Sequence, residues 1–442
     1  MGAALRPRAA DRRARTGAVS TAGPAHDVAL AAAGLARWRR RAVLTLRRAA
    51  GARPLVYAGN RIELLVGGAA YFPQLLAAIE SASRSVHLET YIFDDDAIGA
   101  RVAGALAAAA ARGVAVRVLI DGFGGGETAR RLVAELGAQG AQVLIFRPER
   151  WWRLEHRLLR RLHRKILVVD DRIAFIGGIN IVGDFTAVPP AAGGERRPRY
   201  DFAVRCEGPI VAAAALAVQR LWRTLGWALL RRLERRPLPA LLAQPRFAGG
   251  ARAALLLRDN LRNRTTIERA YLRAIEGART EVLIANAYFL PGRRFRAALR
   301  AAAARGVRVR LLLQGRAEYA VQHHAQRALY GGLLAAGIEI HEYVPSFLHA
   351  KVAVIDDRWA TVGSTNIDPY SLLLAREANV VVFDPRFARH LRAELEQAIV
   401  QDSRRLDAQL YARRGLPARL ADWAGYLVVR AATVLLARAP HY

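Results

Sequence analysis

One motif occurs twice in this sequence, and it constrains the fold and chemistry of the chain more than any other feature. The first copy lies in residues 162–180 and the second in residues 348–366. Counted from the histidine, both copies place lysine at +2, aspartate at +7, glycine at +14 and asparagine at +17. Both also carry Asp-Asp-Arg at the same point. Agreement at so many positions indicates an internal duplication.

The candidate site residues are the polar and small residues of the two copies. They are His163, Lys165, Asp170, Gly178 and Asn180 in the first copy and His349, Lys351, Asp356, Ser364 and Asn366 in the second. The chain has 68 lysines and arginines, and only Lys165 and Lys351 are lysines. A compact ammonium group donates hydrogen bonds in a different geometry from a planar guanidinium. Two lysines at equivalent positions of a repeat therefore indicate a functional pair.

Each copy predicts a β-hairpin with an anion-binding end. Histidine and lysine two residues apart on an extended segment project from the same face. The apolar run that follows predicts a buried strand, Asp-Asp-Arg predicts a turn, and the next apolar run predicts the returning strand. This hairpin brings the glycines and the asparagine back beside the histidine. Small residues let an anion approach the backbone, while lysine and asparagine donate to its oxygens, so the pocket suits a phosphoryl group.

Two such halves facing each other supply the two histidines that covalent phosphodiester exchange requires. One imidazole attacks phosphorus and forms a phosphohistidine. The other protonates the departing oxygen and then takes a proton from the incoming hydroxyl. The two lysines and two asparagines stabilise charge on the non-bridging oxygens. This scheme requires no metal ion and no cofactor, and none is expected.

The duplicated pattern resembles the phospholipase D superfamily, whose signature is His-x-Lys-x4-Asp followed by Gly-Gly or Gly-Ser and Asn. With this length, the chain is most similar to the bacterial cardiolipin synthase branch, over residues 56–400. The resemblance implies that a carboxylate from a later strand orients each histidine, and the matching positions are Asp201 and Glu377. Their spacing from the histidines differs because residues 187–199 are inserted in the first half. The resemblance also assigns the nucleophile to His163 and the acid/base role to His349.

Alternating strand and helix patterns predict an α/β fold. The expected architecture is two phospholipase D-like repeats, each a mixed β-sheet flanked by helices, packed with pseudo-two-fold symmetry around the active site. Five regions are expected: a basic, partly disordered N-terminal segment with an amphipathic helix (1–53), the first phospholipase D-like domain (54–236), a linker (237–250), the second such domain (251–402) and a C-terminal amphipathic segment (403–442).

The charge of the chain predicts an anionic partner. The formal net charge is +31, from 68 basic and 37 acidic residues. Such an excess suits an anionic lipid surface, a phosphate-rich substrate or nucleic acid. Segments that combine tryptophan with arginine, in residues 28–53, 151–162 and 416–442, favour the membrane interface. Arg430 interrupts the longest C-terminal apolar run, which leaves it short of the ~20 residues that a span needs.

These features predict a peripheral or monotopic protein of the cell membrane, on its cytoplasmic side. The only cysteine, Cys206, excludes an intrachain disulfide and fits a reducing compartment. Nucleic acid is not expected as a partner, because single-strand binding uses base-stacking aromatic residues and these make up only 7% of the chain. The sequence does not predict an oligomeric state.

Three functions compete on these grounds. The first, which the sequence favours, transfers a phosphatidyl group through a phosphohistidine to phosphatidylglycerol and yields cardiolipin and glycerol. The second hydrolyses phosphodiesters, either as a phospholipase D or as a metal-independent nuclease. The third is a membrane- or nucleic-acid-binding protein with a vestigial site, and two complete motifs argue against it.

Overall fold

The computed structural model describes residues 54–147, 160–190, 194–228 and 244–438. They belong to one compact unit, residues 53–442, and a second unit comprises residues 1–52. Both motifs lie in the larger unit. The predicted N-terminal helix and nearly all of the tryptophan-rich segment before His163 lie outside the described residues.

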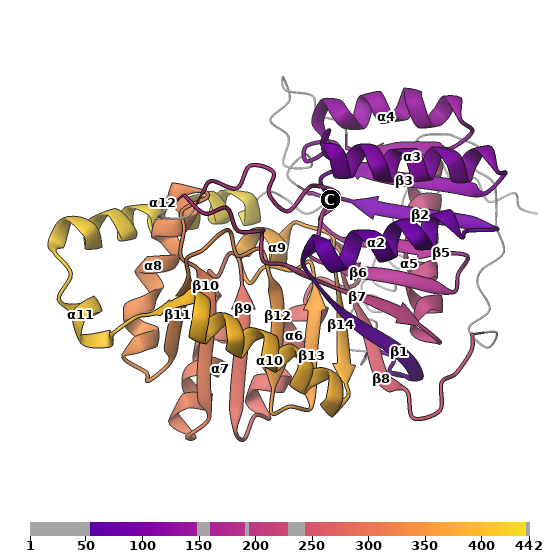
Figure 1. Ribbon diagram of the computed structural model, residues 1–442. Coiled ribbons are helices and arrows are strands. Elements are labelled where there is room, and N and C mark those ends of the chain that lie inside the picture. Colours follow the sequence, from indigo (N-terminus) through magenta and orange to yellow (C-terminus); the bar gives the residue numbers. More distant parts are fainter. Residues whose placement is uncertain (1–53, 148–159, 191–193, 229–243, 439–442) are drawn as a thin grey trace, which may run out of the picture. The chain divides into compact units, whose positions relative to one another are not determined.

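The two halves of this unit repeat one order of strands and helices (Figure 1). The first half contains β1 (Tyr57–Val66), α2 (Gly67–Glu80), β2 (Ser85–Thr90), α3 (Ala97–Ala111), β3 (Ala115–Asp121), α4 (Gly126–Ala138), β4 (Gln142–Phe146), β5 (Lys165–Val169), β6 (Ile173–Gly177), β7 (Phe202–Glu207) and α5 (Ile210–Ala228). The second half contains β8 (Ala251–Arg258), α6 (Thr266–Glu276), β9 (Glu281–Asn286), α7 (Arg293–Ala304), β10 (Arg308–Gln314), α8 (Ala320–Leu334), β11 (Glu339–Tyr343), β12 (Lys351–Ile355), β13 (Trp359–Gly363), α9 (Pro369–Leu373), β14 (Glu377–Phe383) and α10 (Pro385–Asp402). Three elements follow: β15 (Ser403–Arg405), α11 (Ala408–Ala412) and α12 (Leu416–Arg438).

The strands of the described residues join one mixed sheet. Counted outward from the junction, equivalent strands of the two halves follow the same order. The full order is β15-β11-β10-β9-β12-β13-β14-β8-β1-β7-β6-β5-β2-β3-β4. The halves meet where β1 and β8 pair antiparallel, side by side in Figure 1. Within each half, parallel strand pairs lie toward the outside and antiparallel pairs nearest the junction, except that β15 pairs antiparallel with β11 at one edge. The predicted α/β fold with two related repeats is confirmed.

Helices cover both faces of each half-sheet, and one hydrophobic core is shared. That core contains Val168 of β5 and Val354 of β12, together with Val211 of α5 and Leu391 of α10. Side chains of α2, α3 and α4 pack on the other face of the first half. Those of α6, α7 and α8 pack on the other face of the second. The shared core therefore holds the two motif hairpins in one framework.

The motif hairpins turn as the sequence predicts. β5 pairs antiparallel with β6, and β12 with β13. Asp170 and Asp171 both have positive φ, as do Asp356 and Asp357. Type I′ turns require positive φ at both central residues, and aspartate tolerates that conformation better than most side chains. The repeated Asp-Asp-Arg is thus explained by turn geometry.

The C-terminal helix α12 packs on α8 through a buried carboxylate and a close backbone approach. Asp422 is buried and contacts His324 of α8 at 2.9 Å and Arg414 at 2.8 Å. A Cβ at Gly425 would lie 2.8 Å from the Cβ of His324, so glycine permits this packing. Within the described part of the chain, no helix combines the length and hydropathy needed to cross a membrane.

Candidate active site

Two short parallel bridges join the halves at the motif histidines, and the first of them positions His163. Leu162 pairs with Arg376, and the N–H of His163 donates to the carbonyl of Arg376 at 3.0 Å. Glu377 follows Arg376 and therefore lies beside the imidazole. Nδ1 of His163 is 3.0 Å and 3.1 Å from the two carboxylate oxygens of Glu377. The histidine of the first half is held by a carboxylate of the second.

The second bridge does the same for His349. Tyr200 pairs with Leu348, and the N–H of His349 donates to the carbonyl of Tyr200 at 2.8 Å. Asp201 comes next, and its Oδ2 lies 2.6 Å from Nδ1 of His349. A carboxylate can only accept here, so Nδ1 of each imidazole carries the proton. Nε2 is left to react in both rings.

The pairs therefore cross between the halves. The sequence relates Asp201 and Glu377 by spacing to the histidine of the same half. The bridges instead bring each carboxylate to the histidine of the other half. A shared site of this kind requires both halves, because neither histidine keeps its carboxylate when the halves separate.

The histidines and their carboxylates are removed from water, which shifts their protonation. Burial lowers the pKa of His163, and Lys165 lowers it further, while Glu377 opposes the change. Burial also lowers the pKa of His349 well below its ordinary value, assisted by Lys351. Burial raises the pKa of Asp201 to about 6. Burial and the neighbouring lysines therefore favour the neutral form of both imidazoles.

The two lysines lie beneath the histidines on the same face. Nζ of Lys165 donates to the carbonyl of His163 at 2.8 Å, and Nζ of Lys351 donates to the carbonyl of His349. Burial is the main cause that lowers the pKa of Lys165 to about 7 and that of Lys351 to about 8. Each ammonium has donors beyond the one that the backbone accepts. The arrangement suits the charged oxygens of a phosphodiester.

Gly178 and Ser364 occupy equivalent positions but contact their neighbouring carboxylates in different ways. A Cβ at Gly178 would lie 2.3 Å from Oδ1 of Asp201, so only glycine fits there. The hydroxyl of Ser364 instead donates to Glu377. Oδ1 of Asp201 accepts from the N–H of Phe202 at 2.8 Å. Each carboxylate therefore has a second donor that fixes its orientation.

Asn180 and Asn366 lie just beyond β6 and β13 and are buried. Oδ1 of Asn180 accepts from the N–H of Ile92 at 3.2 Å, which points its amide nitrogen away from that contact. Oδ1 of Asn366 has no hydrogen-bond partner among the described residues. A buried amide group without a partner is costly. This oxygen is therefore placed to accept a hydrogen bond from a water molecule or a ligand hydroxyl.

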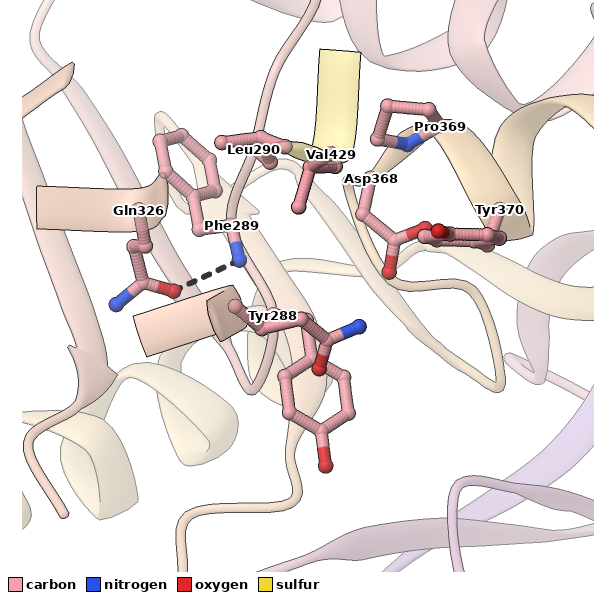
Figure 2. Close-up of a pocket in the computed structure, with 9 residues that line it drawn as sticks. Tyr288, Phe289, Leu290, Gln326, Asp368, Pro369, Tyr370 and Val429 are labelled. Atoms are coloured by element: carbon pink, nitrogen blue, oxygen red, sulfur yellow. Dashed lines mark hydrogen bonds between the residues drawn. The ribbon is translucent and has the colours of Figure 1, made fainter. Parts of the chain in front are cut away.

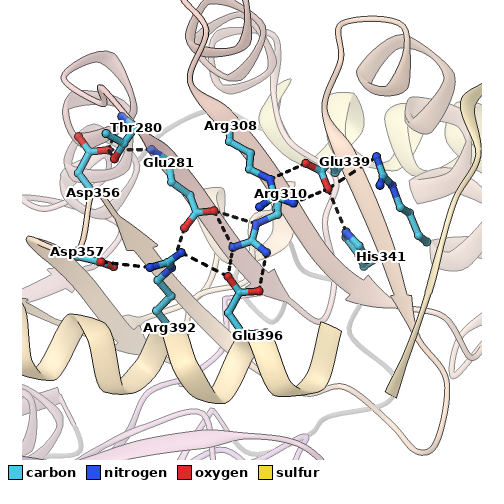
Figure 3. Close-up of polar contacts among 11 residues, drawn as sticks. Thr280, Glu281, Arg308, Arg310, Glu339, His341, Asp356, Asp357, Arg392 and Glu396 are labelled. Carbon is cyan, nitrogen blue, oxygen red and sulfur yellow. Dashed lines mark hydrogen bonds and ion pairs between the residues drawn. The ribbon is translucent and has the colours of Figure 1, made fainter. Parts of the chain in front are cut away.

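Asp170 and Asp356 lie at the other ends of β5 and β12, roughly 15 Å from the lysines by the rise of a strand. The carboxylate of Asp170 accepts from the backbone N–H groups of residues 83, 84 and 85. Asp356 does the same for residues 279, 280 and 281. Figure 3 shows Asp356 beside Thr280 and Glu281. Each carboxylate ties its turn to the start of a neighbouring strand. Neither contacts a motif histidine.

The position between histidine and lysine differs between the halves, and an ion pair accounts for the difference. Arg164 is buried and pairs with buried Glu89 of β2, whose Oε1 accepts from Nη2 at 2.8 Å. The equivalent residues of the second half are Ala350 and Ala285, both in the shared core. The fold thus accepts either two charges or two apolar residues at this pair of positions.

The replacement of a buried ion pair by two alanines in the other half leads to a prediction about stability. Glu89→Leu leaves the Arg164 guanidinium buried without its carboxylate and is expected to cost about 3–5 kcal/mol of unfolding free energy. Glu89→Leu combined with Arg164→Met is expected to lie within about 2 kcal/mol of the wild type, because it removes both charges together. Urea denaturation of the three proteins measures the difference. A double variant as unstable as the single one would contradict this interpretation.

A small pocket lies next to the site on the side of α12 (Figure 2). Tyr288, Asp368 and Tyr370 line it, and Val429 of α12 closes it. Its volume of about 10 Å³ is room for one water molecule. Asp368 is buried, which raises its pKa to about 7, and its carboxylate caps α9. The pocket is too small for a lipid headgroup.

Known proteins resemble this chain across both motifs. A family model described as "Cardiolipin synthase, PLD-like domain" matches residues 75–184 and 271–399, which contain the two motifs. Cardiolipin synthase B of Escherichia coli (strain K12) is 42% identical over 358 residues, which cover 80% of this chain and 84% of that protein. Cardiolipin synthase A of Pseudomonas fluorescens (strain SBW25) is 32% identical over 347 residues, covering 78% of this chain and 69% of that protein.

Solved structures share the fold at low sequence identity. Phosphatidylserine synthase of Haemophilus influenzae Rd KW20 superposes with a TM-score of 0.61 at 15% identity, over 88% of this chain and 99% of that one. Polyphosphate kinase of Porphyromonas gingivalis gives a TM-score of 0.52 at 15% identity, over 85% of this chain and 53% of that one. The duplicated motifs, the family match and the relatives lead to one conclusion: the chain belongs to the cardiolipin synthase family of phospholipase D-like enzymes.

Proposed function

We propose that this enzyme transfers the phosphatidyl group of one phosphatidylglycerol to a second, giving cardiolipin and free glycerol. One observation carries the proposal. His163 and His349 each have a carboxylate on Nδ1 and a free Nε2, in a single site built from both halves. The 42% identity to cardiolipin synthase B of Escherichia coli supports phosphatidylglycerol as the substrate.

In the first step, Nε2 of His163 attacks phosphorus as the bond to the donor's glycerol oxygen breaks. The proton on Nε2 of His349 goes to that oxygen, and glycerol leaves. His349 must be protonated for this step, although burial and Lys351 disfavour its charge. An anionic phosphodiester placed between these groups offsets the positive field and favours the imidazolium.

In the second step, the acceptor hydroxyl attacks phosphorus and the bond to His163 breaks. Nε2 of His349 takes the hydroxyl proton, so both imidazoles return to their starting state. Lys165, Lys351 and the amides of Asn180 and Asn366 stabilise the charge on the non-bridging oxygens. We assign Asp170 and Asp356 to the fold and not to the reaction, because their carboxylates bind backbone N–H groups at the far strand ends.

A product assay tests the proposal. Purified protein is incubated with phosphatidylglycerol vesicles in the presence of a metal chelator, and a His163→Ala sample prepared in parallel controls for contaminating lipases. We expect equal amounts of cardiolipin and glycerol from the wild type alone. Phosphatidic acid as the sole lipid product would make the protein a phospholipase D. Cleavage of nucleic acid without lipid turnover would make it a nuclease of the same superfamily.

We also propose that the protein is peripheral on the cytoplasmic face of the cell membrane and that α12 contacts the lipid. Four of its apolar side chains, Leu416, Leu420, Trp423 and Leu427, are between 50% and 66% exposed. Their spacing places them on one face of the helix. Exposed Arg419 and Arg430 on the same helix complement anionic headgroups.

Replacing part of this face tests the proposal. Leu420→Ser combined with Leu427→Ser is expected to weaken binding to phosphatidylglycerol vesicles at least tenfold, because each leucine contributes about 1.5 kcal/mol or more when buried. Leu261→Ser, which alters an equally exposed leucine in the loop after β8, is the matched control. Vesicle co-sedimentation provides the measurement. Unchanged binding of the double variant would rule out α12 as the contact.

A further inference from the structure

We propose that Arg199 binds the phosphate of the acceptor lipid, a second phosphodiester that does not react, and so directs the phosphatidyl intermediate to lipid instead of water. The inference rests on the proposed function and goes beyond it by naming a second anion site. Arg199 immediately precedes Tyr200, whose carbonyl accepts from the N–H of His349 at 2.8 Å.

The backbone around Arg199 is held on both sides. Its N–H donates to the carbonyl of Asp184 at 2.9 Å, and its Nη2 donates to the carbonyl of Thr186 at 3.2 Å. Tyr200, the next residue, donates its N–H to the carbonyl of Phe347 at 3.0 Å. The guanidinium is therefore anchored to the first half, beside the bridge that carries His349.

Contacts with the second half fix the inserted segment that leads to Arg199. Oγ of Ser346 donates to the carbonyl of Pro198 at 2.5 Å. The guanidinium of Arg316 donates to the carbonyls of Pro189 and Pro190 at 3.0 Å and 2.8 Å. Arg316 also donates to the carbonyl of Pro345 at 3.2 Å. Arg199 makes one side-chain hydrogen bond among the described residues and keeps other guanidinium donors available.

Arg199 is a half-buried cation without a close ion-pair partner. Among the described residues, no carboxylate forms an ion pair with its guanidinium within 4.0 Å. Asp184 and Asp201 interact with it at longer range, where its charge opposes the burial-driven rise in their pKa values. Its field reaches the site, where it contributes to lowering the pKa of both His349 and Lys351. It also opposes the burial-driven rise in the pKa of Tyr319, the residue that precedes α8. A phosphate bound there would satisfy this charge.

The position of Arg199 has no basic counterpart in the other half. The bridges place Tyr200 and Arg376 at equivalent positions, so the second-half counterpart of Arg199 is Ala375, whose carbonyl instead accepts from the guanidinium of buried Arg258. Under the proposed mechanism, the acceptor hydroxyl loses its proton to His349, which lies on the same side of the site as Arg199. Lys165 and Lys351 bind the oxygens of the reacting phosphoryl group. A cation on the His349 side therefore suits a charge that belongs to the acceptor.

The acceptor carries such a charge. In phosphatidylglycerol the attacking hydroxyl and the lipid's own phosphodiester are joined through the headgroup glycerol. Guanidinium binds phosphate oxygens through paired, charge-assisted hydrogen bonds. Water and neutral alcohols have no phosphate and gain nothing from Arg199. The residue therefore determines which acceptor resolves the phosphohistidine.

The partition of the intermediate between acceptors tests this role. Mixed vesicles of phosphatidylglycerol and phosphatidylcholine are incubated with enzyme and a fixed concentration of ethanol, and cardiolipin, phosphatidylethanol and phosphatidic acid are quantified together. We expect Arg199→Ala to lower the ratio of cardiolipin to the other two products roughly 10- to 100-fold, the range for a lost charge-assisted contact. Arg199→Lys is expected to recover part of the ratio. Arg196→Ala, an exposed arginine of the same segment, is the matched control and leaves it unchanged.

The ratio comes only from turnovers by folded enzyme, so a variant that folds poorly loses total product without altering it. An unchanged ratio in Arg199→Ala, while the wild type makes cardiolipin, would overturn the inference and leave the proposed function standing. A wild type that makes only phosphatidylethanol and phosphatidic acid would overturn the proposed function, and the inference with it.

Discussion

His163→Ala is expected to abolish cardiolipin formation, lowering kcat by about 10⁴-fold or more, because the chain loses the nitrogen that bonds to phosphorus. His349→Ala is expected to lower kcat by about 10²- to 10⁴-fold, the range for a lost general acid and base. A donor with an activated leaving group separates the two roles. Phosphatidyl-p-nitrophenol releases a phenolate that needs no proton, so its first step bypasses His349.

With that donor, His349→Ala should release a burst of p-nitrophenolate equal to the enzyme concentration and then turn over slowly. His163→Ala should give no burst. Rapid-mixing absorbance measures both. If the burst appeared in His163→Ala and not in His349→Ala, the nucleophile would be His349 and the assignment of roles would be reversed.

Glu377→Gln and Asp201→Asn are expected to have the next largest effects, each lowering kcat by about 10²- to 10⁴-fold, because an amide can donate to Nδ1 and stabilise the wrong tautomer. A comparable change in the serine protease triad costs about 10⁴. The crossed pairs predict which step each change slows. Glu377→Gln should suppress the burst, since Glu377 orients the nucleophile. Asp201→Asn should preserve the burst and slow the later turnover.

If each histidine paired with the carboxylate of its own half, Asp201→Asn would suppress the burst and Glu377→Gln would preserve it. The burst therefore distinguishes crossed pairing from pairing within each half. Asp170→Asn is the matched control, because this carboxylate belongs to the motif but contacts backbone N–H groups. It should lower the denaturation midpoint and leave the burst amplitude per folded molecule unchanged. Suppression of the burst by Asp201→Asn but not by Glu377→Gln would contradict the crossed arrangement.

The sequence predicts the hairpins and the fold because those depend on local pattern. Each motif sets its own strand, turn and returning strand, and the observed β5–β6 and β12–β13 pairs agree with it. The duplication then predicts a repeated order of elements and a shared site. Periodicity and turn chemistry act within about ten residues, so a single sequence carries this information directly.

The crossed pairs depend on long-range packing, and no local pattern records them. His163 and Glu377 are 214 positions apart in the chain. They meet because two bridges of one residue each join the halves. The sequence analysis did not predict the Glu89–Arg164 pair, for the same reason. The contrast between Arg164 and Ala350 at equivalent positions of the repeat could have indicated it.

The two motif aspartates show that a carboxylate within a catalytic motif can bind the backbone and take no part in the chemistry. A carboxylate seven positions after a histidine suggests chemistry, yet an extended strand separates Asp170 from His163. The Asp-Asp-Arg turn is the signal that marks a structural role, since aspartate is favoured both in turns and as an acceptor for backbone N–H groups. In Figure 3 Asp356 lies among such contacts at the far end of β12.

The proposed reaction passes through a phosphatidyl group covalently bound to His163, with His349 as the proton carrier. Mapping that adduct shows whether it does. His349→Ala is mixed with the activated donor, quenched in base to preserve phosphohistidine, digested and analysed by mass spectrometry. We expect the phosphatidyl mass on the peptide that contains His163. An adduct on another residue, or a burst of phenolate without any adduct, would contradict the mechanism.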